Sequence, residues 1–521
     1  MVAAAPGNAA AQQTTIQTKS GPVRGAGTDV VVFKGIPYAA PPIGARRWRP
    51  PAPVEPWTAV RDANQFGPQC PQQASFAPRG GLPMAPTPTS EDCLTLNVWT
   101  PAKSRSERLP VMVWIHGGGF TIGSGSSPRA SGEMLAGQGV VVVTFNYRLG
   151  ALGFFSHPDL SRESDQHVSG NYGLLDHVAL LRWVRDNIEA FGGDPSNVTV
   201  FGQSAGASSV AGVLMVSPLA RGLFHRVIAQ STGATGTVGP KPRLRDVYYG
   251  LPAAEAKNQS MAPDITKLRA MTGDEVIAAL PNSPTFSTDW HFGAVIDGYV
   301  LPDDPGVLLG TSRQAKVPLL IGYNADEAMF YRREAFQTAS EYRDFVRKLF
   351  PTEFTDAVLT RYPAADDARA AGAVLRMFTD FRFVTPTVLT ARAASNVTDV
   401  YMYRFSRVSP LNQTTFGGAA HGTEIPYVFG HIAADESQYE AIDRTLSSAM
   451  AGAWVQFAKT GNPNGISLPQ WPAFRAPEFR LLEYGNEITI RSNVDSSNID
   501  FFQHIFEVMR GKQTSPRDSS K

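Results

Sequence analysis

The sequence predicts an α/β fold in which a large, mostly parallel sheet is flanked by helices. Short apolar runs, each followed by a glycine-rich or turn-rich segment, are typical of buried parallel strands; they lie at residues 110–115, 140–143, 198–201, 317–322 and 400–405. Between the second and third runs, apolar residues recur at three- and four-residue steps, which predicts a helix packed on the sheet: Leu174, Leu175, Val178, Leu181, Val184 and Ile188. Alternation of strand and helix favours a sheet covered by helices over separate all-α or all-β units.

Composition limits the partners of this protein. The 521 residues are 43% hydrophobic and 18% charged, with 47 Lys+Arg against 46 Asp+Glu and a net charge of +1. A balance this even, without long runs of one sign, speaks against nucleic acid or a membrane surface as a partner. No run reaches about 18 apolar residues, so no membrane-spanning helix is predicted. Nothing in the sequence predicts an oligomeric state.

The chain is expected to form one large domain with insertions. Residues 14–508 contain every periodic segment, and no internal repeat divides them. Residues 1–13 are alanine-rich, which fits either the remnant of an export signal or a disordered tail. Residues 509–521 form a polar C-terminal tail.

Only two cysteines occur, Cys70 and Cys93. No CxxC or HExxH spacing accompanies them, so a zinc site is not expected. They are either two unpaired thiols or one disulfide, and spacing alone leaves both alternatives open. A disulfide would indicate an oxidising compartment.

Residues 201–209 (FGQSAGASS) follow a predicted strand and place Ser204 between two glycines. This pattern fits an ordinary strand-to-helix corner, or a nucleophile elbow that exposes the serine on a strained turn. A serine nucleophile needs a histidine base, an acid that orients the histidine, and N–H donors for the developing oxyanion.

The sequence offers candidates for each requirement. Residues 116–120 (HGGGF) follow the strand at 110–115 and match the glycine-rich loop that supplies oxyanion donors; neither a Walker nor a dinucleotide-binding glycine pattern is present there. The expected donors are the N–H groups of Gly118, Gly119 and Ala205. Among the nine histidines, His421 stands out because it lies in a small-residue loop downstream of a strand. The acid should lie between serine and histidine in the chain, and position does not choose between Asp326 and Glu327.

Several segments resemble type-B carboxylesterases, the group that includes the cholinesterases, over residues 14–506. These segments, in the family order, are 90–97 (SEDCLTLN), 116–120 (HGGGF), 146–150 (NYRLG), 170–176 (GNYGLLD), 191–206 (FGGDPSNVTVFGQSAG), 324–327 (NADE) and 421–430 (HGTEIPYVFG). The resemblance implies an α/β-hydrolase fold with insertions that form a gorge over the active site. It also implies a serine carboxylesterase that needs neither metal nor cofactor and acts on small-molecule esters.

The resemblance assigns roles to individual residues. It implies a triad of Ser204, Glu327 and His421, and a disulfide between Cys70 and Cys93. It places Ser231 beside the acid of the triad. Two pairs, Arg47 with Glu91 and Arg148 with Asp176, correspond to buried ion pairs of the family. The implied disulfide and the alanine-rich start favour a secreted or periplasmic protein.

Departures from the cholinesterase pattern bear on the substrate. The loop between the cysteines has Phe76 and no tryptophan, and Gln203 stands before the serine where cholinesterases have glutamate. Losing the ring and the charge removes much of the preference for a cation, so choline esters should be poor substrates. Residues 139–164 are similar to fumonisin-type carboxylesterases, which release a tricarboxylate, so bulky or polyacid esters are candidate substrates. The rivals are a non-catalytic binding protein, an amidase or carbamate hydrolase, and an interfacial lipase.

Overall fold

The computed structural model describes residues 12–73, 88–232, 249–283, 286, 292–466, 469–476 and 478–514. Its centre is a 13-stranded sheet with the order β1-β2-β3-β5-β7-β6-β8-β9-β12-β13-β14-β15, and β4 pairs with β2. The strands from β7 to β14 in this order run parallel: β7 (Val141–Phe145), β6 (Leu109–Ile115), β8 (Gly193–Gln203), β9 (Arg226–Gln230), β12 (Leu319–Asn324), β13 (Val400–Phe405) and β14 (Arg480–Tyr484).

Antiparallel strands extend this parallel centre at both edges. On the β7 side are β1 (Gln12–Gln17), β2 (Pro22–Gly27), β3 (Val31–Pro37) and β5 (Thr95–Thr100), with the short β4 (Arg61–Asp62) beside β2. On the other side β15 (Ile488–Ser492) pairs with β14. The predicted parallel sheet is therefore confirmed for the centre, whereas the complete sheet is mixed.

The predicted strands and helix appear close to their expected positions. The five apolar runs correspond to β6, β7, β8, β12 and β13, and the periodic segment is α4 (Tyr172–Asn187). Successive side chains of a strand point to opposite faces of the sheet, so each strand contributes to two cores. Val111 and Val113 of β6 join the core that contains α4. Met112 and Trp114 of the same strand join the core that contains α16 (Ala441–Thr460). The buried runs show no polar alternation because helices cover both faces.

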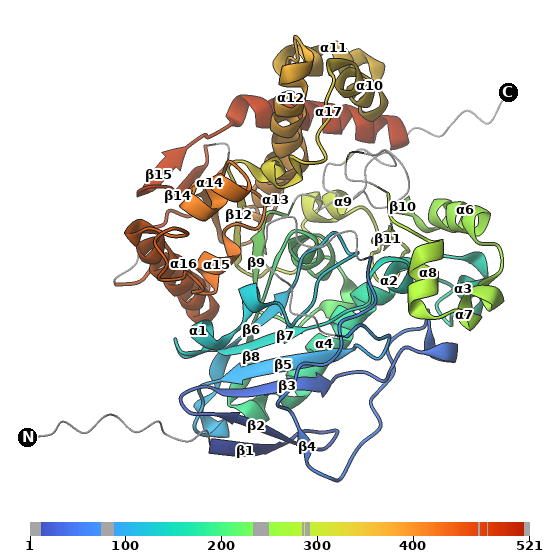
Figure 1. Cartoon of the computed structure of the whole chain (residues 1–521), viewed down its shortest axis with the longest axis vertical. Helices are drawn as coiled ribbons and strands as arrows, with labels where there is room; N and C mark the ends of the chain where they lie inside the picture. Colours follow the sequence, from blue (N-terminus) through green and yellow to red (C-terminus); the bar gives the residue numbers. More distant parts are fainter. Residues whose placement is uncertain are drawn as a thin grey trace, which may run out of the picture.

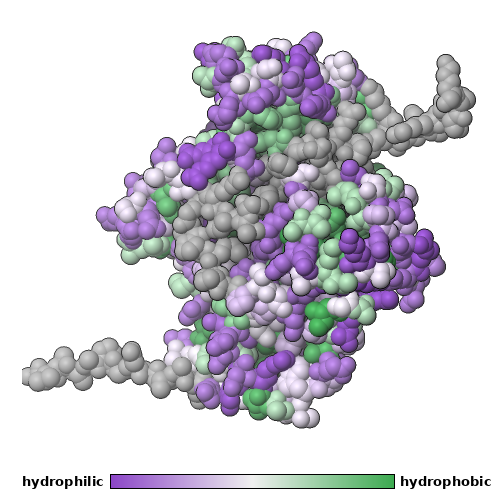
Figure 2. Space-filling model, turned by 45° about the vertical axis from the view of Figure 1, so that its right-hand side comes forward, coloured by the Kyte–Doolittle hydropathy of each residue, from purple (hydrophilic) through white to green (hydrophobic). Residues whose placement is uncertain are grey.

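A group of helices lies beyond the end of the sheet, at the top of Figure 1. It consists of α10 (Ala339–Leu349), α11 (Thr352–Arg361), α12 (Asp367–Thr379) and α17 (Ser496–Thr514). These helices share a phenylalanine-rich core of their own. In Figure 2 hydrophilic residues cover the outer end of this group, and hydrophobic residues lie beneath them. Because α17 continues to Thr514, the first residues of the expected 509–521 tail are helical.

The remaining elements connect these layers. They are α1 (Glu133–Ala136), α2 (Gly150–Phe154), α3 (Pro158–Glu163), α5 (Ala205–Ala207), α6 (Leu251–Met261), α7 (Ile265–Ala270), α8 (Gly273–Ala279), α9 (Pro305–Gly310), α13 (Thr385–Ala394), α14 (Pro410–Thr415), α15 (Ile425–Val428), β10 (Tyr249–Gly250) and β11 (Val295–Ile296). In the part of the chain that the structure describes, no helix has the length and apolar character needed to cross a membrane.

Candidate active site

Ser204 occupies the sharp corner between β8 and α5. Its backbone has φ 58° and ψ −120°, in a region that side chains other than glycine adopt only under strain. The glycines around it are needed for close packing. A Cβ at Gly206 would lie 1.9 Å from the carbonyl oxygen of Ile115, and one at Gly202 would lie 2.6 Å from the carbonyl carbon of Gly206. The corner therefore holds the serine half-buried at the carboxyl end of β8.

The glycine loop that follows β6 lies against this corner. Strands β6 and β8 are parallel neighbours, so their carboxyl ends meet at one edge of the sheet. A Cβ at Gly117 would lie 3.0 Å from Cβ of Ser204. Gly118 and Gly119 have positive φ values of 112° and 62°, and a Cβ at Gly118 would lie 2.1 Å from the carbonyl oxygen of Ile122. Ala205 begins α5, where backbone N–H groups lack partners within the helix. The loop and the helix start thus bring the three expected donors to the neighbourhood of Ser204.

His421 contacts Glu327 and not Asp326. Nδ1 of His421 lies 2.5 Å from Oε2 of Glu327, and both side chains are buried. The other oxygen, Oε1, accepts a hydrogen bond from the Asn324 backbone N–H at 2.8 Å. Asp326 instead accepts from the backbone N–H of Ala419 at 3.0 Å. The geometry therefore distinguishes two acids that sequence position could not separate.

The opposite nitrogen of His421 contacts Gln203. Nε2 of His421 lies 3.0 Å from the side-chain nitrogen of Gln203. Within the described residues, no hydrogen bond joins the Ser204 hydroxyl to another group. Sequence reasoning considered Gln203 only for its missing charge and did not predict this contact, although its position directly before the serine was a usable signal.

Aromatic rings surround His421. The ring of Phe383 lies 4.7 Å from its imidazole, and those of Phe330 and Tyr331 lie 6.1 and 6.5 Å away. Phe330 and Tyr331 belong to the single helical turn η8 (Glu327–Tyr331), and Phe383 belongs to the π-helix η9 (Asp380–Val384). Nothing in the sequence pattern identified these three residues as neighbours of the histidine.

His116, the first residue of the glycine loop, is a buried neutral group. It stacks on Tyr147 with ring centroids 4.3 Å apart, and His177 packs edge-on against the same tyrosine at 4.4 Å. Burial lowers the pKa of His116 to about 4 and that of His177 to about 3. The loop is thereby anchored by an uncharged aromatic stack.

Ser231 directly follows β9, and among the described residues it makes no hydrogen bond to the acid of the triad. It is fully buried with φ 57°, and its backbone N–H donates to the carbonyl of Gly322 at 2.8 Å. Among the described residues its hydroxyl makes no hydrogen bond. The hydrogen bonds of Glu327 run to Asn324 and His421 instead, so a role for Ser231 beside the acid remains a prediction.

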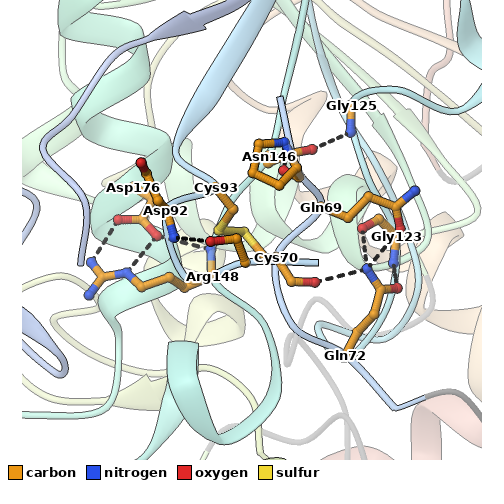
Figure 3. Close-up of a disulfide and its surroundings, with 12 residues drawn as sticks. Gln69, Cys70, Gln72, Asp92, Cys93, Gly123, Gly125, Asn146, Arg148 and Asp176 are labelled. Atoms are coloured by element: carbon orange, nitrogen blue, oxygen red, sulfur yellow. Dashed lines mark hydrogen bonds and ion pairs between the residues drawn. A yellow bond between two sulfur atoms is a disulfide. The ribbon is translucent and has the colours of Figure 1, made fainter. Parts of the chain in front are cut away.

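Cys70 and Cys93 form a disulfide, with Cα atoms 5.0 Å apart. Figure 3 shows Gln72, just after the first cysteine, turned toward Gly123. The Gln72 side chain accepts from the Gly123 N–H at 2.9 Å and donates to its carbonyl at 3.1 Å. The disulfide loop is thus tied to the segment that follows the glycine loop. Phe76 lies outside the described residues.

Both expected ion pairs are present. Arg148 donates to Asp176 through Nε at 2.9 Å and Nη2 at 2.7 Å, and both side chains are buried (Figure 3). Arg47 donates to Glu91 at 2.5 and 2.7 Å. The bidentate geometry fixes the two planar groups against each other.

A cavity of about 420 Å³ lies away from the site, between α4, residues 48–54 and residues 297–300, and contains no residue of the triad. This cavity is therefore separate from the candidate site at the strand ends. In the described ranges, no group of three or more His, Cys, Asp or Glu residues is placed to hold a metal ion.

Comparisons with known proteins identify the family of this chain. A model of the carboxylesterase family matches residues 12–502. The chain is 41% identical to a fumonisin B1 esterase of Sphingopyxis macrogoltabida, over 90% of this chain and 86% of that protein. It is 36% identical to a para-nitrobenzyl esterase of Bacillus subtilis (strain 168), over 92% and 96%.

Solved structures agree as well. A PNB esterase structure superposes with a TM-score of 0.80 at 32% identity, and the match covers 94% of this chain and all of that one. These matches establish the α/β-hydrolase fold. The chain belongs to the carboxylesterase family and is a carboxylic ester hydrolase.

Proposed function

We propose that Ser204 is the nucleophile of this esterase, His421 its base and Glu327 the acid that orients the base. The observation that carries the proposal is the 2.5 Å contact between Nδ1 of His421 and Oε2 of Glu327, beside a serine held in a strained corner. A carboxylate on Nδ1 keeps the proton on that nitrogen, which leaves Nε2 as the acceptor that a general base needs.

In the proposed mechanism, Oγ of Ser204 attacks the ester carbonyl while His421 takes its proton. The N–H groups of Gly118, Gly119 and Ala205 stabilise the oxyanion, each contributing roughly 3 kcal/mol by analogy with measured oxyanion donors. Return of the proton from His421 expels the alcohol and leaves an acyl-enzyme. Water activated by His421 then releases the acid, and Ser204 regains its proton.

We propose neutral, bulky or polyacid esters as the substrates, with choline esters disfavoured. Among the relatives, the name of the fumonisin B1 esterase supports a bulky ester. Arg332 adds support for an acidic ester, because it directly follows η8. A Cβ on Gly417 would lie 3.4 Å from Nη1 of its guanidinium. No ion pair of Arg332 is found in the described part of the chain. Replacing Arg332 by glutamine should therefore raise KM for a tricarboxylate monoester more than KM for a neutral ester.

The proposed arrangement is a single catalytic domain over residues 14–508 in a secreted or periplasmic protein. The sheet that contributes to both main cores supports the single domain, and the disulfide supports an oxidising compartment.

The first test is hydrolysis of p-nitrophenyl butyrate by the protein and by its Ser204→Ala variant. We expect turnover by the wild type and a loss of several orders of magnitude in the variant, at unchanged melting temperature. A variant that retains wild-type turnover would exclude Ser204 as the nucleophile. Hydrolysis of butyrylcholine with a higher kcat/KM than the neutral ester would overturn the substrate preference.

A further inference from the structure

Gln203 makes the contact with His421 that a serine would be expected to make. The side-chain nitrogen of Gln203 lies 3.0 Å from Nε2 of His421. Since Glu327 accepts from Nδ1, Nε2 carries the lone pair of the neutral imidazole. The amide NH₂ of Gln203 is therefore the donor and Nε2 is the acceptor. The lone pair that must take the proton from Ser204 is already engaged in the resting protein.

Two loops leave room for this amide. A Cβ at Gly117 would lie 2.7 Å from Oε1 of Gln203, and a Cβ at Gly422 would lie 3.5 Å from its Nε2. The side chain is thus enclosed between the glycine loop after β6 and the loop of His421, and Gln203 is buried. A buried amide held on both sides has few alternative partners, so its hydrogen bond to His421 is a fixed part of the site.

We propose that Gln203 is a positioning residue that holds His421 in its neutral, Nε2-accepting form in the free enzyme. The inference rests on the proposed roles of Ser204 and His421. During acylation the Oγ–H bond of Ser204 breaks, an N–H bond forms at Nε2, and Oγ bonds to the acyl carbon. The NH₂ of Gln203 cannot donate to the protonated nitrogen, so this hydrogen bond is released in that step. Gln203 itself gains and loses no proton.

The same hydrogen bond opposes protonation of His421 by solvent, which gives the proposal a pH signature. The other groups that bear on His421 are Glu327 in contact, Glu424 at the start of α15, Tyr331 from η8 and Arg382 from η9, whose guanidinium lies 5.7 Å from the ring of Phe383. Arg129 donates to the carbonyl of Gly422 at 2.7 Å, and Asp326 holds the backbone of Ala419. All of these stay in place when only residue 203 changes. A shift of the pH profile between variants at residue 203 therefore measures the effect of the Gln203 amide on the protonation of His421.

The experiment is the pH profile of kcat/KM for p-nitrophenyl butyrate in the wild type, Gln203→Met and Gln203→Glu. Methionine keeps the length and removes the donor. In Gln203→Met, the acid limb of the profile, which is the fall of kcat/KM at low pH, should move to higher pH by roughly half to one unit. This shift is the equivalent of one ordinary hydrogen bond. Glutamate should move it further, because a carboxylate at this position stabilises the imidazolium. An acid limb within 0.2 pH unit of the wild type in both variants would overturn the proposal.

Gln314→Met is the matched control. Gln314 is also a buried glutamine, and its amide makes no hydrogen bond among the described residues. We expect its acid limb to coincide with that of the wild type, even if its melting temperature falls. An equal shift in this control would assign the effect to lost stability and contradict the proposal.

A second readout does not depend on turnover. In protein labelled with ¹⁵N-histidine, the signal lost in His421→Gln identifies the imidazole of His421. Gln203→Met should move its Nε2 resonance downfield, toward that of a free lone pair, and leave the Nδ1 resonance in place. Unchanged Nε2 and Nδ1 resonances would refute the hydrogen bond. If the wild type failed to hydrolyse any ester, the mechanism would fall, while these resonances would still decide the role of Gln203.

Discussion

Replacing Glu327 by glutamine tests the proposed triad most directly, because it changes one atom and keeps the volume. The carboxylate accepts two hydrogen bonds, from Nδ1–H of His421 at 2.5 Å and from the Asn324 backbone N–H at 2.8 Å. An amide has only one acceptor oxygen. It can satisfy the histidine or the backbone, but not both.

Either orientation damages the site. If the oxygen faces Asn324, the NH₂ group faces Nδ1, which must then accept, and the proton moves to Nε2, where it blocks the base. If the oxygen faces His421, the NH₂ group meets the N–H of Asn324, and a buried donor is left unpaired at about 1–3 kcal/mol. The charge that stabilises the imidazolium is lost in both cases. We expect kcat to fall by about 10⁴-fold, as when the acid of a serine triad becomes an amide.

The assay is hydrolysis of p-nitrophenyl butyrate at pH 8, with the melting temperature measured in parallel. Asp326→Asn is the matched control, since among the described residues the neighbouring carboxylate accepts one hydrogen bond, from the Ala419 N–H. This variant should lose less than about tenfold in kcat, which corresponds to one weakened hydrogen bond. The reasoning fails if the two variants exchange these results, or if Glu327→Gln retains more than a tenth of wild-type kcat.

Three further predictions concern stability. Burial lowers the pKa of His116 to about 4 and that of His177 to about 3. The contribution of these two neutral histidines to the free energy of unfolding is therefore complete above pH 6.5 and is lost as the pH falls. By pH 5 the free energy of unfolding should drop by about 4 kcal/mol from this cause. Asp380, whose pKa burial raises to about 6, offsets about 1 kcal/mol of this loss; an unfolding free energy equal at pH 7 and pH 5 would contradict the assignment. Gly206→Ala should cost at least about 2 kcal/mol in urea unfolding, whereas Gly250→Ala, with open space around its Cβ position, should cost far less; equal losses would count against the close packing at the corner. Reducing the disulfide, which links residues 23 apart, should lower the unfolding free energy by about 3 kcal/mol, and an unchanged melting temperature under reductant would exclude that contribution.

Sequence patterns predicted much of the central sheet and its covering helix, because the interactions that form these elements are local or periodic. The apolar runs identified β6, β7, β8, β12 and β13, and the helical spacing identified α4. The antiparallel strands at the edges were not predicted, because short, partly exposed strands such as β15 have little hydrophobic pattern.

The sequence by itself determined which chemistry is available: a serine between glycines, a glycine loop, and a histidine and acid in the right chain order. The tertiary structure decided which atoms meet. Asp326 and Glu327 are adjacent in sequence, yet only Glu327 reaches His421, because the turn after β12 directs the two side chains to different parts of the loop. The contact between Gln203 and His421 joins residues 218 positions apart. Sequence spacing carries no information on such a contact, because it arises only when the carboxyl ends of parallel strands are brought to one edge of the sheet.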